Sequence, residues 1–231
     1  MPPTTSDRER PRRTLDVGCG RGELGLAQVD RGDEVVAIDI DFDRLTQAAR
    51  RAGKNQALGR MAFVRADAAR LPFRPASFDH AMCFELLEHV DDPAVVLSEL
   101  RRVVAAGAEL ELSVPTWRTE QLFRLIWPEW LAVCTHRRIF RRAMMTSLLR
   151  ERGFHVDHVE GRYFYWAYFW LFHCFARTRH DGTGRTDEHQ SLTRVLEGVW
   201  DWLESLPGWR LCARIGNRVF PKSVYFRCHA G

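Results

Sequence analysis

Between Thr14 and Val114 the sequence alternates short apolar runs with longer amphipathic stretches. This alternation is the pattern of β-α-β units, because parallel strands need a crossover helix between them. It predicts an α/β fold with a Rossmann-like, mostly parallel sheet and helices on both faces. Strands are expected at 14–17, 34–40, 62–66, 78–84, 109–114, 155–161 and 223–229, which makes a seven-stranded sheet. Helices are expected at 23–31, 43–52 and 94–105, and a further helix ends at Arg152.

The length of 231 residues suits one domain that carries insertions. Residues 1–13 are rich in Pro, Arg, Thr and Ser and are expected to form a disordered tail, so that 14–231 is the domain. Its core is predicted to comprise 14–114, 145–161 and 222–229. The insertions are then 115–144 and 162–221, and both are rich in aromatic residues and helical patterning.

Composition excludes several classes of protein. Apolar residues make up 45% and charged residues 28%, which argues against a disordered chain. The net charge is only +4, with 30 acidic residues interspersed among 34 basic ones, so a nucleic-acid partner is not favoured. The six cysteines form no C-x-x-C motif, which predicts reduced, mostly buried thiols and no metal site. Because the N-terminus lacks the apolar segment of a signal peptide, a cytoplasmic location is expected.

A glycine-rich turn, Gly18-Cys19-Gly20-Arg21-Gly22, follows the first predicted strand and opens a helix. Glycine permits positive φ and lets backbone approach a ligand closely, although a tight turn without a ligand would look the same. The spacing differs from the dinucleotide motif G-x-G-x-x-G. Asp16, two residues before Gly18, would repel a pyrophosphate and attract a cationic amino group. These features favour S-adenosylmethionine over NAD.

Asp39 lies 21 residues after Gly18, at the end of the second predicted strand. From this position a carboxylate can accept hydrogen bonds from both hydroxyls of a ribose. The alternative is that Asp39 caps the following helix. Asp41 and Asp43 are better placed as caps, so we favour the ribose contact.

Four motifs appear in order between Asp16 and Pro93: DVGCGRG, VVAIDID, RADAARLPFRPASFD and FELLEHVDDP. Together they cover about a third of the chain. In sequence and interval they resemble class I S-adenosylmethionine-dependent methyltransferases of the UbiE-like, Methyltransf_11 type. The resemblance implies that S-adenosylmethionine is the cofactor, with Asp16, Gly18 and Gly20 holding its methionine end and Asp39 its ribose.

The resemblance also assigns the rest of the cofactor site. It implies that Ile40 packs on the adenine, that Asp67 accepts from the adenine amino group, and that the backbone of Ala68 reads the ring edge. Phe84 and Glu85 would lie beside the sulfonium and the amino group of the donor. In each case an ordinary structural role is the alternative: Asp67 could end a strand and Phe84 could be core.

Two histidines are candidates for a general base, which is needed only if the acceptor must lose a proton. His89 follows the fourth predicted strand with Glu85 four residues away, and its alternative role is to brace the next helix. Glu88 is expected to be a solvated or ion-paired loop residue. His136 lies ahead of a basic stretch that borders the acceptor pocket in similar enzymes; its alternative is a surface histidine without a role.

The insertions bear on the acceptor. Residues 163–176 are fourteen positions without a charge, and as a helix they would be about 21 Å long, too short for a bilayer core of about 30 Å. This segment could be a lid over a lipophilic acceptor such as an isoprenoid, lipid or polyketide-like molecule, or it could contact a membrane surface. The alternatives are a hairpin packed against 192–206 and a homodimer interface. A second apolar surface is expected from Phe123, Ile126, Trp127 and Trp130.

The prediction is therefore a methyltransferase acting on O or C of a small acceptor. The rival functions are an NAD-dependent oxidoreductase and a non-catalytic adenosyl-binding partner protein. The oxidoreductase is disfavoured by Asp16, by the glycine spacing and by the absence of a Tyr-x-x-x-Lys pair in the sequence.

Overall fold

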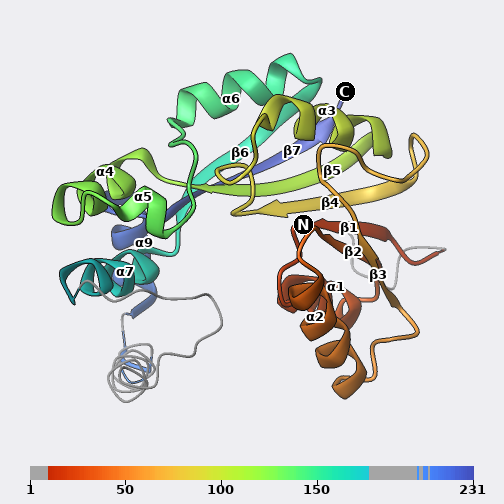
Figure 1. Ribbon diagram of the computed structural model, residues 1–231, viewed down its shortest axis with the longest axis horizontal. Helices are drawn as coiled ribbons and strands as arrows, with labels where there is room; N and C mark the ends of the chain where they lie inside the picture. The colour runs from red at the N-terminus through yellow and green to blue at the C-terminus, as the bar shows by residue number, and fades with distance from the viewer. Residues whose placement is uncertain (1–9, 177–201, 203–204, 208) are drawn as a thin grey trace. The chain divides into compact units, whose positions relative to one another are not determined.

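The computed structural model describes residues 10–176, 202, 205–207 and 209–231 (Figure 1). Its centre is a seven-stranded sheet with the order β3-β2-β1-β4-β5-β7-β6. The strands are β1 (Arg13–Val17), β2 (Glu34–Asp39), β3 (Met61–Arg65), β4 (Phe78–Phe84), β5 (Val104–Pro115), β6 (Phe154–Arg162) and β7 (Ser223–Ala230). The pairings that join β3, β2, β1, β4 and β5 are all parallel. The predicted fold class is confirmed.

One strand starts earlier than predicted. β5 begins at Val104, immediately after helix α3 (Pro93–Val103), whereas the helix was expected to continue to residue 105. Val104 is extended and pairs with Phe78, and Gly107 has a φ of 73°. A β-branched residue followed by a positive-φ glycine favours a strand with an irregularity over another helical turn.

The remaining helices that cover the sheet are α1 (Glu23–Asp30), α2 (Phe42–Lys54) and α6 (Arg142–Glu151). Figure 1 shows α1 and α2 on one face of the sheet and α3 and α6 on the other. The side chain of Asp41 caps α2, and that of Asp92 caps α3 just before Pro93. These caps satisfy backbone N–H groups that a helix cannot pair internally.

The chain divides into two compact units. We call residues 1–114, 142–159 and 225–231 the sheet unit, and residues 115–141 and 160–224 the aromatic unit. The helices described in the aromatic unit are α4 (Trp117–Ile126), α5 (Trp130–Val133), α7 (Phe164–Ala176) and α9 (Trp209–Val219). Within the part of the chain that the structure covers, no helix combines the length and the apolar character needed to cross a bilayer.

The aromatic unit has a core of its own. Phe123, Trp127 and Trp130 are buried in one cluster, against which Trp170 and Leu171 of α7 pack. The rings of Phe123 and Trp130 meet edge to face with centroids 4.9 Å apart, and those of Trp130 and Trp170 do so at 5.5 Å. The apolar segment 163–176 therefore contributes to this core. Most of 192–206, its suggested partner in a hairpin, lies outside the described residues.

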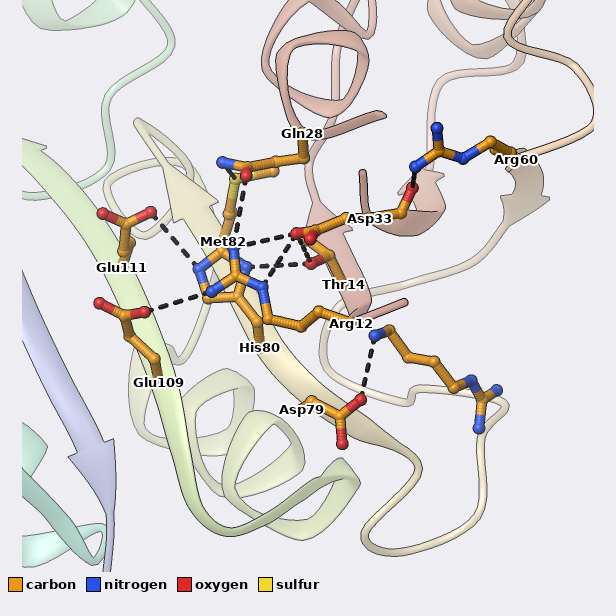
Figure 2. Close-up of polar contacts among 11 residues, drawn as sticks. Arg12, Thr14, Gln28, Asp33, Arg60, Asp79, His80, Met82, Glu109 and Glu111 are labelled. Atoms are coloured by element: carbon orange, nitrogen blue, oxygen red, sulfur yellow. Dashed lines mark hydrogen bonds and ion pairs between the residues drawn. The ribbon is translucent and has the colours of Figure 1, made fainter. Parts of the chain in front are cut away.

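A polar network crosses the amino-terminal half of the sheet (Figure 2). His80 on β4 is fully buried, and its Nδ1 lies 3.1 Å from Oγ1 of Thr14 on β1. That hydroxyl donates to Asp33 at 2.8 Å, and Arg12 binds the same carboxylate at 2.9 Å. On the other side, His80 Nε2 lies 3.4 Å from Oε2 of Glu111 on β5. Arg12, which falls in the segment expected to be a tail, is thus tied into the sheet.

Candidate functional site

The glycine turn forms at the carboxyl end of β1. The N–H groups of Gly18 and Cys19 both donate to the Ile38 carbonyl at 2.9 Å, which ties the turn to β2. Gly18 and Gly20 have φ values of 71° and 53°, a region that L side chains rarely adopt. A Cβ on Gly18 would lie 2.9 Å from Leu86, whereas one on Gly20 would have no described atom within 4 Å. The backbone at Gly20 therefore faces open space, where a ligand can approach.

Asp16 lies just before this turn and is buried, with an exposed fraction of 2%. Burial raises the pKa of its carboxyl group from 3.8 to about 7; a hydrogen bond from the Gly25 backbone opposes the shift and the charge of Asp39 adds to it. Its Oδ2 atom has no hydrogen-bond partner among the described residues. A buried carboxylate oxygen without a partner is unfavourable. A cationic group of a ligand would satisfy it, so the residue fits an amino-bearing cofactor.

Asp39 ends β2 with its carboxylate held in place by backbone N–H groups. Gly20 donates to Oδ2 and Asp41 donates to Oδ1, both at 2.9 Å. Each carboxylate oxygen can accept a further bond, so the group can still bind two hydroxyls. The alternative role is wrong, since Asp41 and not Asp39 caps α2. The next residue, Ile40, exposes 62% of its surface, as an apolar platform for a ring would.

The end of β3 lies beside the end of β2. Ala66 N–H donates to the Asp39 carbonyl at 3.2 Å, and the Arg65 side chain binds the Ile40 carbonyl. Asp67 is exposed, and its Oδ1 accepts from Ala69 N–H at 2.9 Å, which orients the carboxylate. Ala68 is buried. The predicted adenine contacts thus fall on adjacent strand ends.

Phe84 and Glu85 end β4. The Phe84 ring stacks on Tyr225 of β7, with centroids 6.2 Å apart. Glu85 has a φ of 50°, which is strained for a residue with a side chain. It is held by Ser113 of β5, whose carbonyl accepts from Glu85 N–H at 3.0 Å and whose hydroxyl donates to Glu85 Oε1 at 2.7 Å. Sequence reasoning missed Ser113, because only strand register places it there.

His89 follows β4 in a turn, where its N–H donates to the Leu86 carbonyl at 2.9 Å. Its side chain is half-buried, and its Nε2 lies 4.0 Å from Oε1 of Glu88. Glu88 is buried, so the expectation of a solvated residue is wrong; its contact with His89 is an ion pair when the imidazole is protonated. The turn packs the Glu88 side chain inward and leaves the imidazole at the surface of the sheet unit.

The thiols near this edge are not nucleophiles. Burial raises the pKa of Cys83, and the negative charges of Glu88 and Asp16 raise it further. Burial and the same kind of repulsion, from Asp16 and Asp39, raise the pKa of Cys19. Because the thiolate is the reactive form, both groups stay protonated and inert at neutral pH.

His136 belongs to the aromatic unit. Its Nδ1 lies 3.0 Å from Oε2 of Glu120, which also accepts from Trp130 Nε1 at 2.9 Å. Both the His136 and the Glu120 side chains are largely buried, so the alternative of a surface histidine is wrong. Glu120 was not singled out from sequence. Glu120 could have been found from its place on the apolar face of α4 that also carries Phe123, because a buried acid needs a partner.

In the sheet unit, the carboxyl ends of β1 to β4 carry all nine predicted cofactor residues: Asp16, Gly18, Gly20, Asp39, Ile40, Asp67, Ala68, Phe84 and Glu85. His89 follows the same edge, and His136 stands in the other unit. Ligands of open α/β sheets bind at the carboxyl edge. The polar residues of the opposite half of the sheet bind one another, as Figure 2 shows, whereas Asp16 keeps an oxygen atom without a protein donor in the described chain.

Comparison with known proteins gives three findings. The methyltransferase domain family matches residues 15–112. A ubiquinone biosynthesis O-methyltransferase from Xylella fastidiosa (strain M23) is 34% identical over 184 residues, covering 76% of this chain and 70% of that protein. The 27-O-demethylrifamycin SV methyltransferase of Amycolatopsis mediterranei is 37% identical over 101 residues, covering 43% of this chain and 37% of that protein. A solved structure of a SAM-dependent methyltransferase from Methanosarcina mazei has a TM-score of 0.62 at 18% identity, covering 100% of this chain and 97% of that one, which bears on the fold alone.

Proposed function

Because the chain belongs to the class I S-adenosylmethionine-dependent methyltransferases, we propose that it transfers the methyl group to an oxygen atom of a small lipophilic acceptor. The methyl donor of this enzyme is S-adenosylmethionine. Family membership sets aside the oxidoreductase alternative. The choice of oxygen rests on relatives whose names specify O-methylation, including the ubiquinone biosynthesis O-methyltransferase.

Asp16 is the observation that supports the donor site best. Its buried Oδ2 would accept a hydrogen bond from the α-amino group of the donor, and the positive charge would favour the ionised carboxylate. Asp39, already oriented by the N–H groups of Gly20 and Asp41, would bind the ribose hydroxyls. Ile40, Asp67 and the Ala68 backbone would hold the adenine. Gly18 and Gly20 would hold the methionine end, for which the open backbone at Gly20 leaves room.

The donor supplies a methyl group already activated on a sulfonium, so the protein must mainly align the acceptor and exclude water. Phe84 would shield the reacting centre, and Glu85 would face the donor amino group from the end of β4. A hydroxyl acceptor loses a proton, and His89 would accept it at Nε2. The Glu88 carboxylate 4.0 Å away would stabilise the imidazolium that results. His136, oriented by Glu120, is the second candidate for this proton transfer.

The lipophilic character of the acceptor is supported by the names of the relatives and by the aromatic unit. Ubiquinone and rifamycin are the products or substrate classes named for those relatives, not for this chain. The aromatic unit also exposes large aromatic side chains, among them Trp166 and Tyr168, and such a surface suits a lipophilic acceptor better than a charged one. An acceptor of this kind resides in a bilayer, so we further propose a peripheral contact with the membrane. A homodimer is the competing use of exposed apolar surface.

Calorimetry tests the donor site. S-adenosylhomocysteine should bind the wild-type protein and NADH should not. Asp39→Ala should weaken S-adenosylhomocysteine binding by at least about tenfold, because it removes charge-assisted hydrogen bonds to the ribose. Asp30→Ala is the matched control, since Asp30 is an exposed acid at the end of α1. Unchanged affinity in Asp39→Ala would show that the ribose assignment is wrong.

Turnover tests the acceptor. The enzyme should methylate a phenol or catechol that bears a long apolar chain, and should act poorly on the same ring without the chain. His89→Ala should lower kcat with little change in donor affinity. If the donor binds and no phenolic acceptor is methylated, the O-methyltransferase proposal fails and the non-catalytic adenosyl-binding alternative gains support.

A further inference from the structure

Helix α9 presents an apolar stripe to solvent. Leu211, Ile215 and Val219 recur at i, i+4 and i+8 and therefore lie along one side of the helix. They expose 60%, 54% and 64% of their surface, respectively. A helix of a globular protein normally turns such a stripe toward the core. Three large aliphatic side chains in line on the exposed side of one helix indicate a binding surface.

The opposite side of α9 faces its own unit through Trp209, Gly216 and Asn217. Gly216 packs so closely on the Phe164 ring that a Cβ would lie 2.5 Å from it. Asn217 accepts from Phe164 N–H through Oδ1 at 2.9 Å, and Trp209 places its ring 5.5 Å from that of Phe164. These contacts with the start of α7 determine which side of α9 faces inward. The outward direction of the apolar stripe is thus set by the packing of the helix.

Positive charge flanks the stripe. Arg214 and Arg218 are exposed; on a helical wheel Arg218 borders the stripe on its Leu211 side, and Arg214 lies next to Arg218. From residue 205 to the end of the printed sequence there is no Asp or Glu, while Arg210, Arg214, Arg218, Lys222 and Arg227 supply five basic residues. The uncharged segment 163–176, which packs beside α9, adds no acid. The described face of α9 thus combines exposed aliphatic side chains with the exposed Arg214 and Arg218.

We infer that α9 docks the protein on an anionic bilayer surface. Leu211, Ile215 and Val219 enter the boundary between headgroups and acyl chains, and Arg214 and Arg218 bind lipid phosphates. With eleven residues α9 is about 16 Å long, so it lies in the plane of the interface. Charge complementarity selects this occupant: a second copy related by a two-fold axis would bring the same arginines together. A nucleic acid would match the arginines but not the aliphatic stripe.

This inference rests on the proposed membrane contact and names the surface and the lipid charge that it uses. The test is flotation of the 231-residue protein with vesicles of phosphatidylcholine alone or mixed equally with phosphatidylglycerol, at low and high salt. Wild-type protein should float with the anionic vesicles, and high salt should release it. Ile215→Ser/Val219→Ser and Arg214→Glu/Arg218→Glu should each weaken this binding by at least about tenfold.

The matched control is Leu58→Ser/Arg50→Glu, which makes the same kinds of change at exposed positions of the sheet unit. It should bind vesicles as the wild type does. Every variant should bind S-adenosylhomocysteine normally, so loss of vesicle binding with intact donor binding separates this inference from the proposed enzyme activity. The inference would be overturned if the wild-type protein did not bind anionic vesicles, or if the α9 variants still bound them. If the wild type formed a concentration-dependent dimer and bound no vesicles, and if the α9 variants did not dimerise, the stripe would be assigned to contact with a second copy.

A labelling experiment tests the same inference on the wild-type protein, so its outcome does not depend on whether a variant folds. Cys212 is exposed on α9 beside Leu211. Anionic vesicles should slow its modification by a water-soluble maleimide, followed by peptide mass spectrometry, whereas phosphatidylcholine vesicles should not. Equal modification rates with and without anionic vesicles would count against docking through α9.

Discussion

Asp16 in the sheet unit and Glu120 in the aromatic unit are both acids with almost no exposed surface, yet their surroundings differ. Glu120 Oε2 has two partners, Trp130 Nε1 at 2.9 Å and His136 Nδ1 at 3.0 Å. Asp16 Oδ2 has none within the described part of the chain, and its pKa is raised to about 7 by burial. A buried acid with its partners in place is part of the scaffold, whereas one with an oxygen atom that lacks a donor indicates where a ligand supplies it.

The same contrast separates the two ends of the sheet. At the amino-terminal half, Asp33 is buried but accepts from Thr14 and Arg12. At the carboxyl-terminal edge, Asp39 has backbone donors that orient it without using all its acceptor capacity. At the amino-terminal half the buried polar groups bind one another, whereas at the carboxyl-terminal edge Asp39 keeps acceptor capacity for the donor.

The largest effect is expected from Asp16→Asn. This change removes the negative charge opposite the donor amino group and should weaken S-adenosylhomocysteine binding by about a hundredfold, measured by calorimetry. The unliganded protein should be no less stable at pH 8, because the buried charge is gone. Strong destabilisation without ligand would mean that Asp16, like Glu120, is a scaffold residue.

Glu120→Ala should behave in the opposite way. It leaves Trp130 Nε1 and His136 Nδ1 without their shared acceptor, so the free energy of unfolding should fall by about 3 kcal/mol. Donor affinity should change less than twofold or so, because every predicted donor residue lies in the sheet unit. Urea unfolding followed by tryptophan fluorescence measures the free energy of unfolding. Glu129→Ala, at an exposed position, is the control. A hundredfold loss of donor affinity in Glu120→Ala would contradict the assignment of Glu120 to the scaffold and of Asp16 to the donor site.

Donor affinity should also depend on pH. The pKa of Asp16 is raised from 3.8 to about 7 in the folded protein, so the unliganded fold loses stability as pH rises through that interval. A cationic ligand lowers the pKa again and displaces the proton. Affinity for S-adenosylhomocysteine should therefore rise by about tenfold between about pH 5.5 and pH 7.5. Calorimetry in buffers of different ionisation enthalpy should detect proton release, and Asp16→Asn should abolish it.

The smallest effect is expected at Ser113, which supports Glu85 from the neighbouring strand. Ser113→Ala should lower the free energy of unfolding by about 1 kcal/mol and weaken donor binding a few-fold. Ser98→Ala removes a hydroxyl from an exposed helical position and should do neither. If both variants behave alike in a binding titration, the strained Glu85 backbone does not depend on Ser113.

Much of the fold was predictable because it depends on local patterns. The alternation of buried strands with amphipathic helices placed β1 to β4 within one or two residues of their bounds, and Asp92 before Pro93 marks the start of α3. The boundary between α3 and β5 was misplaced because Val104 can continue a helix or start a strand, and pairing with Phe78 selects the strand.

The sheet, the family and the residues that would bind the donor could be predicted from the sequence, because they depend on the order and spacing of residues along β1 to β4. Tertiary structure decided which buried acid has partners. Glu120 meets His136 across sixteen positions, and Glu85 meets Ser113 across twenty-eight. Tertiary structure also turned the stripe of α9 outward, since Gly216 and Asn217 pack on Phe164. Contacts between distant residues form only when the chain packs, and no local pattern carries them.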